Sequence, residues 1–313
     1  MRRSGVTSKG LRGRPGAQSG GTLTGCLSMR RGAQSGVTLV ELVVTIAVGS
    51  AVVAFMALFI VGPMNAYSAQ ARRAELVDDA DSALRFIERD LRQALPASVR
   101  IGGSGSITAL ELLATLDGAR YRDSGPLTDA TRELDFTAPD GAFATTVPFT
   151  QLTLPWTSST SYLSIYNVGV PGADAYSMVN VITPAGTTVS ISAGSTPNEN
   201  LVTLSPAFKF AYGSPGKRVY LLSGPVSYLC DTGTGTLTRY SGYSIQASQP
   251  VSAVALLGAG AMASKIAADV GACQFTFSTG TAQRNALVTL TMQLTRAGES
   301  VQLLREVQLA NSP

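Results

Sequence analysis

The chain carries no charged side chain between Glu41 and Arg72, and this stretch limits what it can fold into. Residues 42–61 within it are almost entirely apolar. A helix of about 20 apolar residues spans the ~30 Å hydrocarbon core of a bilayer, whereas an ordinary secretory signal has an apolar core of only about 7–15 residues. The sequence therefore predicts a membrane-spanning helix. A bend or break is expected at Gly62-Pro63, because proline removes a helical hydrogen bond.

Glu41 stands at the edge of this apolar segment, where an ionisable group is costly. A cut after Gly36 would create a free α-amino group on Val37, four residues before the Glu41 carboxylate. That spacing allows an ion pair within one helix or between neighbouring helices. Alternatively, the segment is a plain signal anchor whose boundary falls after Glu41.

The composition excludes many catalytic sites. The chain of 313 residues has no histidine, which rules out Ser-His-Asp and Cys-His centres and His-ligated metals. Its three cysteines are too few for a four-thiolate zinc site. We expect no enzyme, no metal site and no cofactor.

The net charge of +4 comes from the N-terminal segment. Residues 1–36 hold seven of the 24 Lys and Arg side chains and no acid, which leaves 17 basic against 20 acidic side chains in the rest. The remainder has no basic stripe interleaved with aromatic residues, so we expect no nucleic-acid partner.

Residues 30–42, Arg-Arg-Gly-Ala-Gln-Ser-Gly-Val-Thr-Leu-Val-Glu-Leu, resemble the cleavage and methylation motif of type IV prepilins and pseudopilins. In that family a prepilin peptidase cuts after the glycine and methylates the new N-terminus. The resemblance implies cleavage between Gly36 and Val37, N-methylation of Val37, and a role for Glu41 in assembly. The implied partners are the prepilin peptidase, other pilin or pseudopilin subunits, the inner-membrane assembly platform and the membrane.

Two features depart from the family pattern. Val37 replaces the usual phenylalanine, and a leader of 36 residues is long. A start at Met29 would give a leader of ordinary length. Two other processing sites are open alternatives: a lipoprotein-type box ending at Cys26, and a secretory small-x-small site at residues 69–71.

A second helical pattern follows the apolar segment. Apolar residues recur at spacings of three and four, which traces one face of a helix, and Pro96 disfavours helix at Leu95. We therefore expect helix over residues 37–95. The expected organisation is a leader (1–36), a transmembrane and assembly helix (37–71), its continuation into the head (72–99) and a β-rich globular head (100–313). The expected buried face comprises Leu76, Ala80, Ala83, Leu84, Ile87, Leu91, Ala94 and Leu95.

Residues 71–84, 89–99 and 298–308 further resemble the pilin-like subunits of MSHA-type pilus biogenesis. The function this implies is a minor structural subunit of an MSHA-type IV pilus, held in the inner membrane by a single span with its head outside the cytoplasm, and then in the pilus. A minor J-type pseudopilin of type II secretion is one alternative. A membrane-anchored surface adhesin is another, with aromatic candidates Trp156, Tyr162, Tyr166 and Tyr176.

The sequence of residues 100–313 predicts a β-rich head. Residues 286–295 and 301–309 alternate apolar and polar side chains around a turn, which predicts a hairpin with one buried face. We expect an α+β, pilin-like fold, with the helix on an antiparallel sheet and long loops at 117–160 and 169–200. Cys230 and Cys273 flank strand candidates and form either a disulfide or two buried thiols. Further strand candidates are residues 162–168, 201–204, 218–222, 226–230, 237–240 and 274–278.

Overall fold

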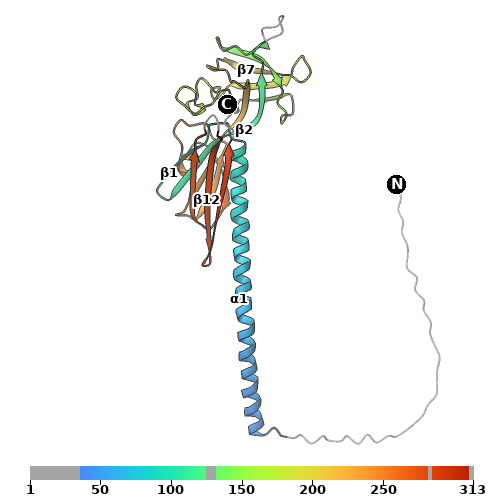
Figure 1. Cartoon of the computed structure of the whole chain (residues 1–313), viewed down its shortest axis with the longest axis vertical. Helices are drawn as coiled ribbons and strands as arrows, with labels where there is room; N and C mark the ends of the chain where they lie inside the picture. Colours follow the sequence, from blue (N-terminus) through green and yellow to red (C-terminus); the bar gives the residue numbers. More distant parts are fainter. Residues whose placement is uncertain (1–35, 125–131, 281–283, 310–313) are drawn as a thin grey trace, which may run out of the picture. The chain divides into compact units, whose positions relative to one another are not determined.

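The computed structural model describes residues 36–124, 132–280 and 284–309. These residues form one long N-terminal helix and antiparallel β-sheets, so the protein belongs to the α+β class (Figure 1). The chain divides into two compact units, residues 1–60 and 61–313. The expected leader lies outside the described residues except for Gly36, and so do Cys26 and the alternative start at Met29.

Helix α1 runs from Leu39 to Arg92 and contains Pro63. The helix is therefore not broken at Gly62-Pro63, and it is slightly shorter at both ends than the predicted 37–95. Its distal part buries Leu76, Ala80, Ala83, Leu84, Ile87 and Leu91, which confirms the apolar face read from the periodicity.

The helix ends before Pro96 because the backbone that follows pairs with a strand. The strand β2 spans Ile107–Tyr121. The Leu95 amide donates to the Leu113 carbonyl at 2.8 Å, and the Thr115 amide donates to the Gln93 carbonyl at 2.9 Å. Sheet hydrogen bonds thus replace the last helical turn that the sequence predicts, while Leu95 itself is still buried.

Most of the head is one 10-stranded antiparallel sheet with the order β10-β9-β8-β2-β3-β7-β6-β4, in which β1 also pairs with β2 and β5 with β8. A second sheet has the order β11-β12-β13. The remaining strands are β1 (Arg100–Ser104), β3 (Asp140–Val147), β4 (Trp156–Ser158), β5 (Tyr162–Ser164), β6 (Thr188–Ala193), β7 (Asn200–Phe208), β8 (Arg218–Asp231), β9 (Thr236–Ser241), β10 (Met262–Ala267), β11 (Val270–Ser278), β12 (Ala286–Arg296) and β13 (Glu299–Leu309); a short helix α2 spans Ala253–Gly258, and one turn of 3₁₀ helix spans Ala175–Ser177.

The predicted C-terminal hairpin is confirmed as β12 and β13, which pair from Arg296↔Glu299 to Ala286↔Leu309. Two predicted strands, 218–222 and 226–230, are one strand, β8, which passes through Gly224 at a φ of 116°. The expected long loops also contain structure: β2 reaches Tyr121, and β3, β4 and β6 lie within the two ranges.

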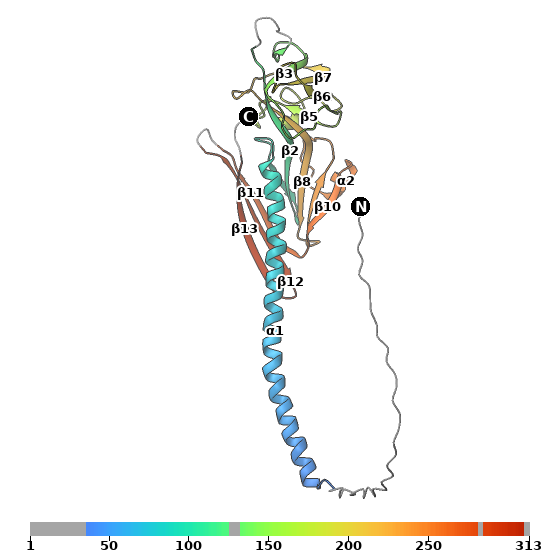
Figure 2. The same ribbon diagram turned by 90° about the vertical axis from the view of Figure 1, so that its right-hand side faces the viewer.

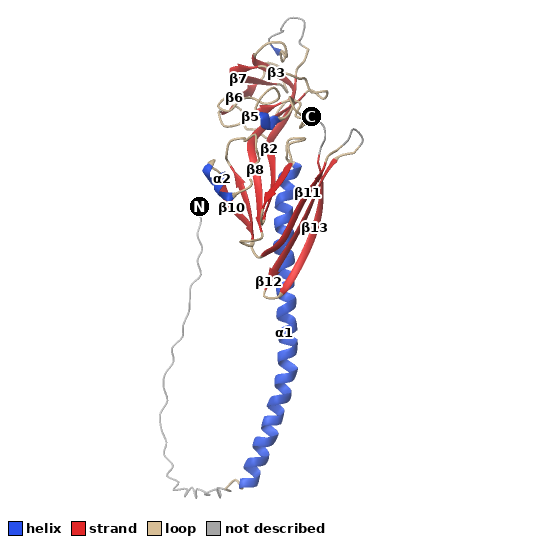
Figure 3. Cartoon of the chain, turned by 90° about the vertical axis from the view of Figure 1, so that its left-hand side faces the viewer, coloured by secondary structure: helices blue, strands red, loops and turns tan. Residues whose placement is uncertain are grey.

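The distal part of α1 lies between the three-stranded sheet and the lower part of the large sheet (Figures 2 and 3). One hydrophobic core joins all three elements. It contains Leu84 and Ile87 from the helix, Leu110 from β2, and Leu290 and Met292 from β12. A second core, around Phe143 and Phe210, lies among β3, β6, β7 and the upper parts of β2 and β8. The helix is thus a core element of the head.

Candidate functional site

The candidate processing site lies just before the first turn of α1. Gly36, Val37 and Thr38 precede the helix, which begins at Leu39. The Thr38 Oγ1 accepts the Glu41 amide at 3.2 Å, and the Thr38 carbonyl accepts the Leu42 amide at 3.0 Å. Thr38 is therefore the N-cap residue, and Thr-x-x-Glu has the sequence of a capping box. The Gly36–Val37 peptide bond consequently lies outside the helix.

Glu41 occupies the first turn of α1 and is exposed. A carboxylate in this position interacts favourably with the positive end of the helix dipole. The predicted pairing of Val37 with Glu41 assumed that both residues lie in one helix, one turn apart. In the uncut chain Val37 lies before the helix, so this spacing does not apply. The ion pair between a cleaved Val37 amine and Glu41 stays a prediction.

The proximal part of α1 has an apolar surface without a protein cover. No part of its most apolar stretch is buried in the described structure. The hydroxyls of Thr45 and Ser50 donate to the carbonyls of Leu42 and Ala47, each at 2.9 Å, so these polar groups are satisfied within the helix. By length and composition, this helix is able to cross a membrane.

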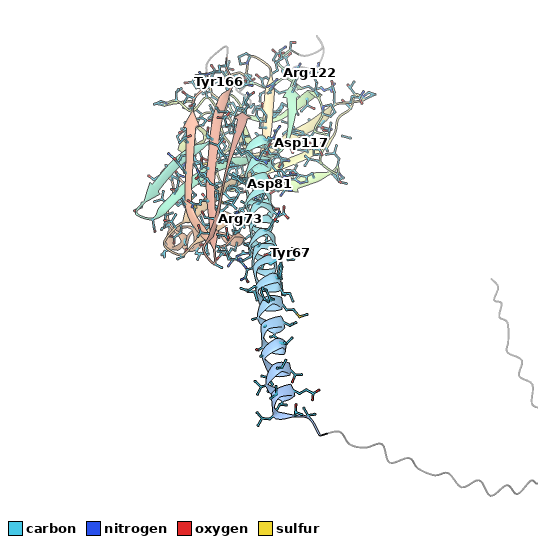
Figure 4. All side chains as sticks on the ribbon, turned by 60° about the horizontal axis from the view of Figure 1, so that its bottom comes forward. Tyr67, Arg73, Asp81, Asp117, Arg122 and Tyr166 are labelled. Carbon is cyan, nitrogen blue, oxygen red and sulfur yellow. A yellow bond between two sulfur atoms is a disulfide. The ribbon has the colours of Figure 1, made fainter. Side chains whose placement is uncertain are left out.

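Ion pairs fasten the distal part of α1 to the three-stranded sheet. Arg305 of β13 donates to Asp81 and Glu88 of the helix, each at 2.6 Å. Arg73 pairs with Glu299 at 2.5 Å. Figure 4 shows Arg73 and Asp81 along the helix beside this sheet. The hydrogen bond from Arg305 holds the pKa of Glu88 below its usual value.

A second contact joins the helix to the large sheet. The Asp90 Oδ2 of α1 accepts hydrogen bonds from the Tyr228 hydroxyl and the Arg239 Nε, both at 2.7 Å. Burial and the neighbouring Asp90 carboxylate raise the pKa of Tyr228 well above its usual value of 10.0. The helix is thus held by polar contacts to both sheets.

Cys230 of β8 and Cys273 of β11 form a disulfide, with their Cα atoms 6.5 Å apart. Cys230 is fully buried, and both cysteines belong to or pack against the core that contains the helix. The bridge covalently joins the large sheet to the three-stranded sheet. The alternative of two free thiols is therefore not what the structure shows.

A buried glutamate in β2 is a polar feature that sequence reasoning missed. Glu111 has no exposed surface, and its carboxylate accepts from the Arg100 Nε at 2.6 Å and the Tyr243 hydroxyl at 2.8 Å. Arg100 also lies 3.6 Å above the centre of the Tyr176 ring. The available signal was a single acid within the apolar run of residues 107–116. Its contacts are all internal, which is typical of a structural role.

The four aromatic residues considered for a surface binding module do not form an exposed site. Tyr162 and Tyr176 are buried core residues. Trp156 and Tyr166 pack against the second core, and the Tyr166 ring lies 5.8 Å from that of Tyr212. Figure 4 shows Tyr166 at the far end of the head from Tyr67 on α1.

The described residues contain no group of three or more Cys, Asp or Glu side chains placed to hold a metal ion. Comparison with family models, curated proteins and solved structures gives no match to this chain. Its function therefore has to be inferred from the helix, its N-terminal motif and the head.

Proposed function

We propose that this protein is a structural subunit of the type IV pilin and pseudopilin class, and more narrowly a minor subunit of an MSHA-type pilus. One observation carries the proposal. The Gly36-Val37 pair stands directly before the capped start of an uncovered apolar helix, and the distal part of the same helix is built into an antiparallel β-head. The narrower assignment to an MSHA-type pilus rests on the sequence resemblance alone.

In this proposal, the residues around the start of α1 have distinct roles. The Thr38 cap keeps the Gly36–Val37 bond outside the helix, where a peptidase has access to an exposed, non-helical backbone. Cleavage frees the Val37 amine, and methylation leaves its positive charge in place. Glu41 then supplies the nearby anion when helices pack together away from water.

The proposed location is the inner membrane, with the head on the outer side, followed by the filament. The disulfide between the two sheets favours an oxidising compartment for the head. The proximal part of α1 supplies the single span.

N-terminal sequencing and intact mass of the membrane-associated protein test the proposal. We expect a chain that starts at Val37 and carries one additional methyl group. A chain that starts at Arg72 would identify an ordinary secretory signal and overturn the assignment.

The variant Gly36→Ala tests whether the peptidase recognises Gly36 without disturbing the fold of the chain. A Cβ at Gly36 meets nothing within 4 Å, so this substitution leaves the chain's own packing intact. We expect the uncleaved form to accumulate. Gly49→Ala is the matched control, since a Cβ there also meets nothing within 4 Å, and it should be processed normally.

A further inference from the structure

The strand β10 is an uncovered edge of the large sheet. It pairs on one side with β9, and no described strand pairs with its other side. The four residues from Met262 to Lys265 are all exposed, so the head covers neither face of this part of the strand. An edge strand presents unpaired backbone N–H and C=O groups, which form a template for a further strand. The first half of β10 is therefore open to a partner along its backbone and on both faces.

Apolar side chains are exposed around the start of this edge. The short helix α2 leads into β10 through residues 259–261 and exposes Val254 (83%) and Leu257 (54%). Met262, the first residue of β10, is 70% exposed. In Figures 2 and 3, α2 and β10 lie beside each other, on the other side of α1 from the three-stranded sheet. This surface is thus separate from the ion pairs between the helix and that sheet.

The same surface is almost free of charge. Residues 240–264 contain no Asp, Glu, Lys or Arg. Lys265 follows as the single cation of β10, and it has no ion-pair partner in the described part of the chain. Native proteins commonly protect a free edge with several charges, a proline or a bulge. The register of β10 shifts only after Lys265, so residues 262–265 keep the regular backbone that a further strand requires.

Polar contacts hold the segment before α2 in place. The Arg100 guanidinium donates to the carbonyls of Gln246 and Ala247, at 2.8 and 2.7 Å. The buried Glu111 carboxylate holds Arg100 in turn, and the Ser252 hydroxyl caps α2. A surface that is fixed in this way loses little conformational freedom when a partner binds.

We propose that β10 is a docking site for an extended segment of another protein, which adds to the large sheet as an antiparallel strand. Main-chain hydrogen bonds with residues 262–265 supply the pairing, and the exposed apolar side chains shield it from water. The neighbouring strands β8, β9 and β10 all pair antiparallel, and this is the more stable pairing per residue. The contact does not depend on the proposed function, since only the head takes part in it.

The register of β9 and β10 predicts the side chains of the partner strand. Ala263 lies opposite Tyr240, so it faces the side of the sheet on which Tyr240 packs with α2. Lys265 faces the same side, and Met262 faces the other. An acid opposite Lys265 neutralises its charge, and a large apolar side chain fills the space beside the small Ala263. The expected partner sequence is acid-x-apolar-apolar, read from the residue opposite Lys265 to the residue opposite Met262.

Binding of a synthetic peptide to the full-length protein in detergent tests the proposal. The probe is fluorescently labelled Thr-Thr-Glu-Thr-Val-Val-Thr-Ser, whose Glu lies opposite Lys265 in the expected register. We expect saturable binding by fluorescence anisotropy. The reversed sequence has the same composition and should bind about fivefold more weakly, because antiparallel pairing no longer places both its Glu and its Val residues correctly. Equal or tighter binding of the reversed peptide would overturn the antiparallel register.

A charge exchange locates the site on β10. Lys265→Glu should weaken binding of the first peptide by about three- to tenfold, because an attractive cross-strand pair becomes a repulsive one. The same peptide with Lys in place of Glu should then bind the variant more tightly than the wild type. Lys209→Glu, an exposed charge reversal just after β7, is the matched control and should leave binding unchanged. Equal effects of the two substitutions would overturn the assignment to β10.

N-methylation of the peptide separates strand pairing from apolar adhesion. Methyl groups on alternate amides remove the hydrogen-bond donors along one edge of the peptide only. One of the two alternately methylated peptides should therefore lose at least about tenfold in affinity, and the other should retain it. Equal binding of both peptides would show that no strand is added.

The variant Ala263→Cys, in a Cys26→Ser background, tests whether a second copy occupies the edge. Absence of peptide binding, together with dimers of this variant linked by a short bismaleimide, would assign β10 to a second copy and overturn the proposal. Absence of both would overturn it as well. Neither result involves cleavage after Gly36, so the proposed function would stand. A protein that binds the peptide without being cut after Gly36 in its native membrane would overturn the proposed function alone.

Discussion

Arg305, in the last strand of the head, donates a 2.6 Å hydrogen bond to Glu88, which lies 217 residues earlier on α1. This contact ties the C-terminal hairpin to the helix. Together with the shared core, it makes the distal part of α1 a structural member of the head.

A fragment that begins at Arg72 should therefore fold on its own and remain soluble. It keeps the buried face of α1, both sheets and the disulfide, and it lacks the uncovered apolar segment. Size-exclusion chromatography and circular dichroism check this prediction. Aggregation of the fragment in the absence of detergent would contradict it.

Arg305→Ala should destabilise this fragment by about 1–2 kcal/mol, because the partly buried carboxylates of Asp81 and Glu88 each lose one of their two arginine partners. The neighbouring and exposed Glu306→Ala is the matched control and should change the stability by less than about 0.5 kcal/mol. Urea unfolding measures both values. Equal effects of the two substitutions would show that the ion pairs contribute nothing.

Replacing Cys230 and Cys273 by alanine should lower the free energy of unfolding by about 4 kcal/mol in the chain-entropy model, because the bridge spans a sequence separation of 43 residues. Non-reducing peptide mapping first verifies the bridge in the wild-type protein. Urea unfolding of the double variant then measures its contribution. Two thiols that react with an alkylating reagent in the native, unreduced protein would refute the prediction.

Glu111 should make the stability of the fragment depend on pH. Burial raises the pKa of Glu111 above its usual 4.5, despite the hydrogen bonds from Arg100 and Tyr243. The folded protein then binds the proton more tightly than the unfolded chain. Glu111 therefore makes its full contribution to the free energy of unfolding below pH 4.5, and this contribution is lost as the pH rises through the raised pKa of the folded state.

Glu111→Gln checks this direction, because glutamine has a similar shape and does not titrate. The free energy of unfolding of the wild type, minus that of the variant, should decrease between about pH 4 and about pH 7. Urea unfolding at several pH values gives the difference. An increase over this range would mean that the folded state favours the ionised carboxylate.

Glu41→Ala should leave insertion and cleavage largely intact and impair incorporation into filaments. A methylated Val37 amine that packs away from water loses its anion, at a cost of about 3–5 kcal/mol, whereas in a lone membrane helix it still reaches water. Processed membrane-bound protein and filament-associated protein are compared for the Ala and Gln variants. Ser50→Ala is the control, because the Ser50 hydroxyl is bonded within its own helix. Wild-type incorporation of both variants would show that Glu41 is not the partner of the amine.

The helix and its buried face were predicted well, because apolar residues that recur every three or four positions can be recognised from neighbouring residues alone. The strands were predicted less completely. The central strand β2 is buried on both faces from Ala109 to Leu113, so it lacks the alternation that marks a half-buried strand. The Ser-Gly-Pro at 223–225 resembles a turn, yet Gly224 adopts a positive φ and lets β8 continue.

Cleavage between Gly36 and Val37 stays a prediction from the resemblance of residues 30–42 to the prepilin motif, and the N-cap role of Thr38 was missed from the sequence. The Thr-x-x-Glu spacing carried that signal. The contacts of Arg305 had no local signal at all, because the residues that it joins are brought together only by the fold.

The position of the helix between two cross-linked sheets determines how the head carries mechanical load. In Figures 2 and 3, the strands of the three-stranded sheet run alongside α1. A force applied along the helix therefore loads the core and the ion pairs in shear, so many contacts have to yield together instead of one after another. The disulfide prevents the two sheets from spreading apart under that force. Tension on the helix is thus transmitted to the whole head.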